Sequence, residues 1–169
     1  MSNMIISSTN YSDQATSITA SSEVASLPVE NLQDRQLVKV YRSDGATDIT
    51  IDVDFGQGRI IDFVALVRHN ITQTGQIRWR LSNVSDFSTT QHDSGFVDAW
   101  PVVEEFGTLP WGVFSWGGRI NPEVAAEYQI SSFVVLDSPV QARYLRIDIS
   151  DDDQDEGYIE AGRLIAGPA

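Results

Sequence analysis

The stretch from Asp48 to Leu81 most constrains the fold, because it contains the clearest periodic signals in the chain. Apolar and polar residues alternate strictly from Asp48 to Phe55, which predicts a strand that buries one face. Residues 60–67 are apolar at almost every position, which predicts a central strand covered on both sides. After a turn at residues 72–75, the one-sided alternation returns at residues 76–82. The chain therefore contains a sheet that faces a second layer.

The rest of the chain adds more strands than helices. Strand patterns recur at residues 38–42, 96–100, 132–136, 144–149 and 158–166. Residues 27–32 fit one helical turn, and residues 122–128 fit one short helix that Asn121 caps.

These elements predict an all-β chain, built as a two-layer antiparallel β-sandwich. Long connections between residues 83 and 131 favour a jelly roll over a simple meander. We expect an N-terminal arm at residues 1–17 and a single β-sandwich domain at residues 18–166, with an aromatic loop insertion at residues 104–121.

Composition excludes several classes of function. The 169 residues suit one domain, and the absence of cysteine excludes disulfides and thiolate metal sites. A net charge of −13 repels phosphate backbones, so nucleic acid is not an expected partner. No stretch approaches ~18 consecutive apolar residues, so no membrane span is expected. The acidic run at residues 151–156 suits a solvated loop, although a cation or a basic partner would also relieve its repulsion.

The sequence offers little for catalysis. His69 and His92 are its only histidines, and neither a Gly-x-Ser-x-Gly elbow nor a His-x-x-x-His motif occurs. The adjacent carboxylates Glu104 and Glu105 point apart on an extended chain. We therefore expect a protein that is not an enzyme, with His69 hydrogen-bonded rather than catalytic.

Several short motifs occur in a familiar order. Residues 20–23, 27–34, 41–43 and 49–56 open the series, and residues 142–147 and 157–164 close it. Together they resemble the discoidin-like, galactose-binding-like jelly rolls, over residues 18–82 and 132–166. The family's usual terminal disulfide is absent, so the ligands of its animal members are not carried over.

The aromatic insertion narrows the resemblance further. Leu109-Pro110-Trp111-Gly112 and Phe114-Ser115-Trp116-Gly117-Gly118, with the acidic loop before Gly157, look like versions carried by tail proteins of tailed bacteriophages. The resemblance implies a virion component of the tail tip or baseplate, made in the cytoplasm of a bacterial host. Its implied partners are other tail proteins and a host surface glycan.

Galactose-binding-like domains often hold a structural calcium ion in the loop that corresponds to residues 27–34. Asn31 and Asp34 are then the side-chain candidates, and no other cofactor is implied. Calcium takes about six to eight oxygen ligands, so capping and turn formation is the simpler role for these two residues.

Trp111, Phe114 and Trp116 are the candidate binding residues, because exposed aromatic rings are unfavourable unless something covers them. Packing within the chain, contact with a virion protein and glycan binding each satisfy this requirement. Two functions follow. The first is a structural virion protein of a phage tail tip or baseplate, and the alternative is a carbohydrate-binding module that attaches to host surface glycans.

Overall fold

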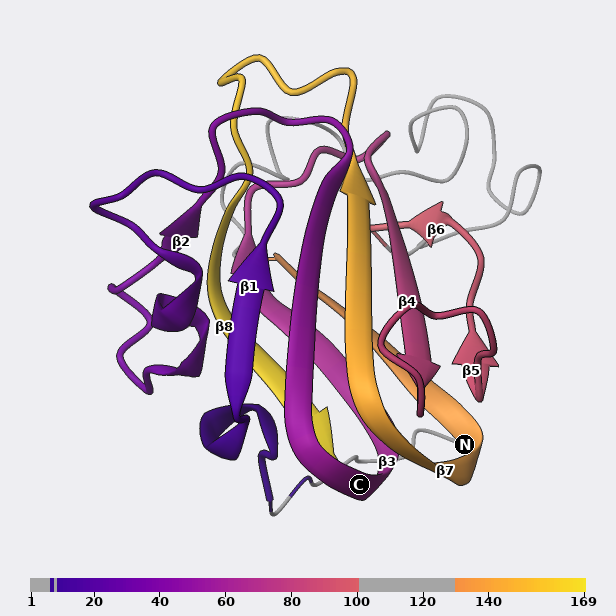
Figure 1. Cartoon of the computed structure of the whole chain (residues 1–169). Coiled ribbons are helices and arrows are strands. Elements are labelled where there is room, and N and C mark those ends of the chain that lie inside the picture. Colours follow the sequence, from indigo (N-terminus) through magenta and orange to yellow (C-terminus); the bar gives the residue numbers. More distant parts are fainter. Residues whose placement is uncertain (1–6, 8, 101–129) are drawn as a thin grey trace, which may run out of the picture.

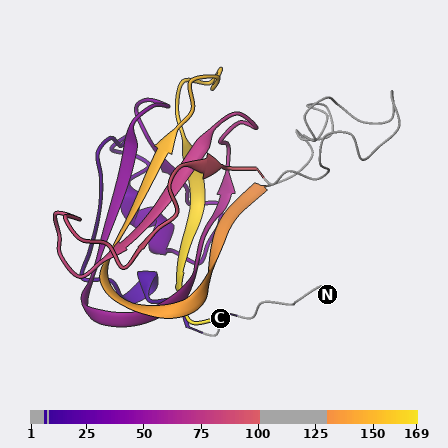
Figure 2. The ribbon, with the colours of Figure 1, turned by 90° about the vertical axis from the view of Figure 1, so that its right-hand side faces the viewer.

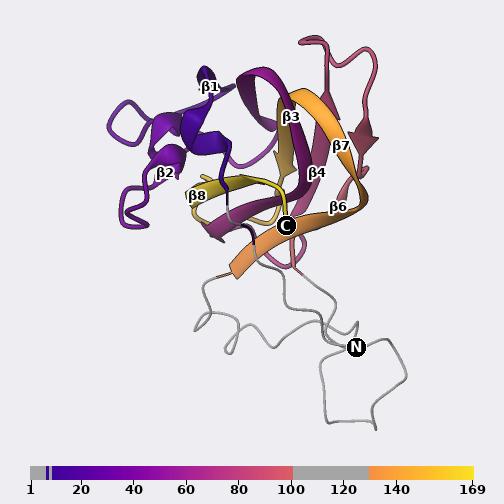
Figure 3. The ribbon, with the colours of Figure 1, turned by 90° about the horizontal axis from the view of Figure 1, so that it is seen from below.

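Two long strands run through both layers of the molecule. The computed structural model describes residue 7 and residues 9–100 and 130–169. Here β3 (Ile49–His69) and β7 (Ile130–Ser150) pair antiparallel along most of their length, with register shifts near the middle of β3 and near its C-terminal end. Figure 1 shows both strands bending at the bottom of the view and continuing into the layer behind, and Figure 3 shows the bends from below. The chain therefore builds its layers by folding one strand pair over.

The first layer contains residues 49–54 of β3 and residues 144–150 of β7. The strands β1 (Ser17–Ala20) and β4 (Gln76–Ser82) flank this pair, and the short strands β5 (His92–Asp93) and β6 (Val97–Asp98) pair with β4.

The second layer contains the other halves of the two long strands. Residues 63–69 of β3 lie between residues 130–135 of β7 and the strand β8 (Glu160–Gly167), which pairs in turn with β2 (Tyr41–Arg42). Figure 2 shows the layers from the side. Two short 3₁₀ helices, η1 (Ser12–Gln14) and η2 (Val29–Gln33), complete the described elements.

This architecture confirms the predicted all-β, two-layer antiparallel sandwich. The alternation from Asp48 to Phe55 is also confirmed, since its apolar residues are buried. The core between the layers gathers such residues from both, and its largest fully buried members are Trp79, Tyr41, Leu32, Ile51, Ile61, Leu66, Ile71, Ile77, Leu81, Leu145, Ile147 and Ile149. The apolar residues at every second position of the strands thus pack against each other between the two layers.

Some predicted element boundaries are wrong. The sequence predicts separate strands at residues 48–55 and 60–67, and again at 132–136 and 144–149, whereas each pair belongs to one bent strand. The strand predicted at residues 38–42 is shorter in the structure, where only Tyr41 and Arg42 form β2. The backbone before them bonds elsewhere, because Asn31 Nδ2 donates to Val40 O and Lys39 N donates to Gln36 O.

The predicted helical turn at residues 27–32 corresponds to η2. The aromatic insertion at residues 104–121 and the helix predicted at 122–128 lie outside the described residues. No helix in the described part of the chain combines the length and the apolar character that crossing a membrane requires.

The described part of the predicted arm is joined to the sandwich. The Asn10 side chain donates from Nδ2 to the carbonyl of Leu164 at 2.9 Å and accepts from the backbone of Ala166 at 2.9 Å. Tyr11 N donates to Ala166 O at 2.7 Å, and Asp13 pairs with Arg163 at 2.7 Å. This segment therefore runs along the edge of β8 that β2 leaves free.

The bend of β3 depends on a glycine. Gly56 has φ of 76°, and its amide donates to Asp54 Oδ1 at 2.7 Å. A Cβ at this position would lie 2.2 Å from Thr16 Oγ1. Only glycine adopts this backbone conformation without strain and leaves room for Thr16.

We expect Gly56→Ala to lower the free energy of unfolding by about 1–3 kcal/mol, measured by urea denaturation. Gly45→Ala is the matched control, because a Cβ there meets nothing within 4 Å, and its effect should stay within about 0.5 kcal/mol. Equal effects of the two substitutions would show that the bend does not depend on Gly56.

Candidate functional site

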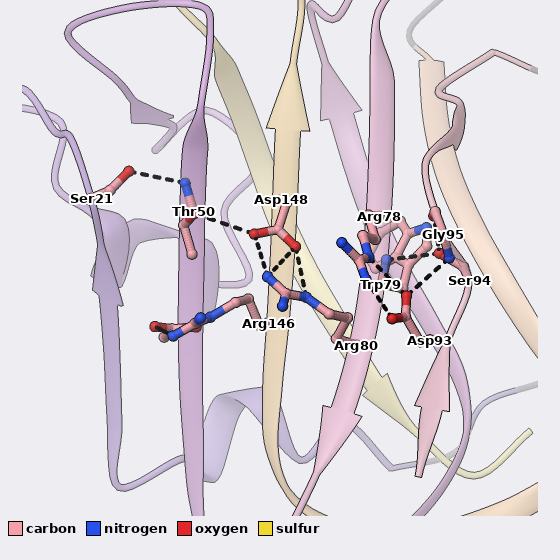
Figure 4. Close-up of polar contacts among 11 residues, drawn as sticks. Ser21, Thr50, Arg78, Trp79, Arg80, Asp93, Ser94, Gly95, Arg146 and Asp148 are labelled. Atoms are coloured by element: carbon pink, nitrogen blue, oxygen red, sulfur yellow. Dashed lines mark hydrogen bonds and ion pairs between the residues drawn. The ribbon is translucent and has the colours of Figure 1, made fainter. Parts of the chain in front are cut away.

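The outward surface of the first layer is covered by a ladder of arginine–aspartate pairs. The polar residues that alternate with the core positions of β3, β4 and β7 form it together with Asp93 of β5, and Figure 4 shows part of it. Its pairs, each bridging two strands, are Arg143–Asp54, Arg146–Asp52, Arg80–Asp148 and Arg78–Asp93. We call this surface the charged face.

Each pair on the charged face is bidentate. Arg80, for example, donates through Nε and Nη2 to the two carboxylate oxygens of Asp148 at 2.9 and 2.8 Å. The Phe87 ring lies between Arg80 and Arg146, with their guanidinium carbons 5.6 and 4.4 Å from its centroid. Exposed ion pairs contribute little to stability, but this geometry holds the side chains in fixed positions.

Phe96 lies at the edge of the charged face. Its side chain is 48% exposed, and the Arg78 guanidinium carbon lies 5.8 Å from its ring centroid. Arg78 is fixed by Asp93, to which it donates at 2.8 and 2.5 Å. We call Phe96, Arg78 and Asp93 together the Phe96 surface.

The segment that carries Phe96 is anchored to β4 on its N-terminal side. Ser94 N donates to Trp79 O at 3.1 Å, and Ser94 Oγ accepts from Trp79 N at 2.9 Å (Figure 4). Gly95, with φ of 65°, donates to Asp93 Oδ1 at 3.0 Å and turns the chain toward Phe96. The exposure of Phe96 is therefore imposed by a fixed backbone.

The polar pair of the Phe96 surface is fully ionised at neutral pH. Hydrogen bonds from Arg78 lower the pKa of Asp93 to about 2, and the hydrogen bond to Asp93 raises the pKa of Arg78 above its usual range. The surface thus offers an apolar ring beside fixed donors and acceptors. Such an arrangement suits binding of an amphipathic ligand and contains no group poised to transfer a proton.

The acidic run at residues 151–156 is only partly the solvated loop that the sequence predicts. Asp151 is buried, and its carboxylate accepts from Thr72 N and Thr72 Oγ1, both at 2.6 Å. Asp153 accepts from Thr74 at 2.7 Å, whereas Asp152 and Asp155 are exposed. The run therefore fastens the β7–β8 loop to the turn between β3 and β4.

The three predicted aromatic binding residues, Trp111, Phe114 and Trp116, lie outside the described residues. Their role stays a prediction. Phe96 and Phe133, which sequence reasoning assigned only to extended segments, are exposed aromatic residues that were missed. The alternation of residues on a strand does not indicate the exposure of Phe96, since its neighbour Val97 is exposed as well.

The predicted calcium ligands make other contacts. Asn31 Nδ2 donates to Val40 O at 2.8 Å, and Asp34 pairs with Lys39 at 2.6 Å and accepts from Gln36 N at 2.9 Å. The hydrogen bond from Lys39 lowers the pKa of the Asp34 carboxyl. Within the described ranges, no group of three or more His, Asp or Glu side chains is arranged for a metal. The two residues as placed do not fit calcium, which stays an untested prediction.

His69 is hydrogen-bonded, as expected, and it is buried. Its Nε2 lies 2.8 Å from Ser132 Oγ, and Ser132 in turn donates to the carbonyl of Ala99. Since the hydroxyl proton goes to Ala99, His69 Nε2 is the donor to Ser132. No described group hydrogen-bonds Nδ1. This arrangement ties the segment after Phe96 to the second layer and leaves His69 without a catalytic partner among the described residues.

No protein-family model matches the sequence, and no curated protein matches it. Solved structures do. The family 32 carbohydrate-binding module of NanJ from Clostridium perfringens, in complex with galactose, aligns with a TM-score of 0.61 at 15% identity, over 94% of this chain and 97% of that one.

Two further structures agree with it. The lectin domain of lectinolysin, complexed with Lewis B antigen, aligns with a TM-score of 0.64 at 10% identity, over 97% of this chain and 99% of that one. The family 32 module of AlyQ, in complex with 4,5-unsaturated mannuronic acid, aligns with a TM-score of 0.59 at 16% identity, over 92% and 96%.

These likenesses show a shared fold. The chain has a jelly-roll fold like that of these carbohydrate-binding modules and this lectin domain. The comparisons give no support to the expected role in a phage tail, and they agree better with the alternative of a carbohydrate-binding module.

Burial lowers the pKa of His69 from 6.5 to about 4, so the folded state favours its neutral form. Between pH 6.5 and 4 the unfolded chain takes up a proton that the folded chain does not. The free energy of unfolding therefore has its full His69 contribution above pH 6.5 and loses on the order of 3 kcal/mol as the pH falls through this window.

Urea denaturation as a function of pH measures this loss. His69→Gln, which retains a donor for Ser132 but does not titrate, should flatten the profile between pH 6.5 and 4. Asp93 affects the free energy of unfolding only at lower pH, because its pKa is lowered from 3.8 to about 2. An unchanged slope in His69→Gln would contradict the assignment.

Proposed function

We propose that the chain is a carbohydrate-binding module and that the Phe96 surface contacts the glycan. The supporting observation is an exposed ring held beside a fixed, ionised Arg78–Asp93 pair, on a fold that glycan-binding modules share. A ring face covers the apolar C–H face of a sugar, and charged planar groups form strong hydrogen bonds with its hydroxyls.

The surroundings of Phe96 distinguish it from the other aromatic side chains. Among those described, only Phe96 and Phe133 are exposed. Phe96 is next to ion pairs and polar backbone, whereas Phe133 packs near another apolar ring, Phe63. A sugar needs both apolar and hydrogen-bonding contacts, so Phe96 has the more suitable environment.

The charge of the chain bears on the class of glycan. A net charge of −13 creates a field that disfavours sulfated or uronic acid polymers. Arg78 does not offset this field, since Asp93 neutralises it. We therefore infer that the ligand is a neutral glycan. The aromatic residues Trp111, Phe114 and Trp116 stay as a second candidate contact for the same ligand.

A glycan array on the full chain, followed by calorimetric titration of each hit, tests the proposal. Phe96→Ala should weaken binding at least about tenfold, corresponding to ~1.4 kcal/mol. Asp93→Asn should also weaken it, because Arg78 loses its bidentate partner. Phe133→Ala is the matched control: it removes the other exposed ring and should leave the affinity unchanged.

The substitutions also separate the two aromatic sites. Loss of binding in Trp116→Ala with full binding in Phe96→Ala would move the site to the aromatic insertion. Binding that survives both changes, or the absence of any glycan ligand, would overturn the proposal.

A further inference from the structure

The second layer has an open edge at the N-terminal half of β7. Residues 130–135 pair with residues 63–69 of β3 on one side. On the other side, no strand in the described part of the chain pairs with them. Figure 2 shows this half of β7 at the right-hand margin of the sheet. An open edge presents backbone donors and acceptors that a further strand can pair with.

The side chains along this edge are suited to a partner. Phe133 is 60% exposed, Val135 is also exposed, and the Phe133 ring centroid lies 6.2 Å from that of the half-buried Phe63. Exposed rings clustered on a sheet are unfavourable in water unless they are covered.

The edge also lacks the usual protection against pairing. Proteins commonly blunt an edge strand with charged residues, proline or a bulge. From Ile130 to Leu136 the sequence is Ile-Ser-Ser-Phe-Val-Val-Leu, without charge, proline or glycine, and the first charged residue is Asp137. One register shift lies opposite Arg68 of β3, between Ile130 and Ser131, and the next lies beyond Val135, so residues 131–135 pair regularly with β3.

We propose that residues 130–136 pair antiparallel with the same residues of a second copy of this chain. The second layers of the two copies would then form one continuous sheet, with the Phe133 rings on a shared outward surface.

The absence of charge in this strand determines where two copies can meet. Chains of net charge −13 repel each other over most of their surface, so a self-contact needs a segment without charge. Residues 130–136 are such a segment, and an antiparallel pair of identical strands satisfies two-fold symmetry. Directly opposite residues of an antiparallel pair point to the same side of the sheet, and outward residues must remain outward in both copies. One residue of the strand therefore lies opposite the same residue of the second copy, at the two-fold axis.

Single cysteines test this symmetry directly, since the chain has no cysteine of its own. Ser131→Cys, Phe133→Cys and Val135→Cys each place one thiol on the exposed side of the edge. Directly opposite positions lie close enough for a disulfide, so mild oxidation should link two chains at the position nearest the axis. Val38→Cys is the control, because Val38 is 78% exposed and is not part of any strand of the sheet.

Sedimentation equilibrium gives a second, cysteine-free readout. The full chain should self-associate, and Phe133→Lys should raise the dissociation constant at least about tenfold by placing a charge on the pairing strand. Phe96→Lys, the change at the other exposed phenylalanine, should leave self-association unchanged. Circular dichroism confirms that both variants are folded.

Several outcomes would overturn the proposal. These are a monomer at every concentration, cross-linking no greater than at Val38, or equal effects of the two lysine substitutions. If the protein is a monomer and the thiol of Phe133→Cys resists thiol reagents, the edge is covered by residues 101–129 of the same chain. If the chain associates only with another protein, that protein covers the edge. Neither result bears on glycan binding, which Phe96→Ala tests separately.

Discussion

The antiparallel pairing of β3 with β7 is the constraint on which the rest of the structure depends. Because the same two strands continue through the bend, each layer inherits its direction and register from the other. The alternation of β3 then assigns apolar residues to the space between the layers and polar residues to the outside. The Arg143–Asp54 and Arg146–Asp52 pairs of the charged face join these two strands, whereas the segment around Phe96 is anchored through β4.

The sandwich presents two exposed phenylalanines in opposite settings. Phe96 is fixed beside an ion pair and polar backbone, whereas Phe133 is on an uncharged edge near another ring. Polar surroundings suit a ligand that carries many hydroxyl groups, and apolar surroundings suit another protein surface. The two proposals therefore assign ligand binding and self-association to different side chains of the same jelly roll.

The fold class could be predicted from the sequence, because the alternation of apolar and polar residues along a strand indicates which residues are buried. It did not predict that residues 48–67 form one strand, since the segment Gly56-Gln57-Gly58 has the composition of a turn as well as of a bend. The partner of Asp54 is Arg143, 89 positions away, and no local pattern indicates such a pair. Asn31 and Asp34 were identified as calcium ligands, but in the folded loop the Asn31 amide nitrogen donates to Val40 O and the Asp34 carboxylate pairs with Lys39. Contacts between distant segments thus limited what could be predicted of the site.

The position of β8 affects how the chain is made. Its residues 160–167 come last among the strands, yet β8 lies between β3 and β2, and the N-terminal residues Asn10 and Tyr11 bind alongside it. The central place in the second layer thus stays empty while the ribosome synthesises everything before it. Closure of the sandwich is a late event, governed by contacts of high sequence separation, and such topologies fold slowly.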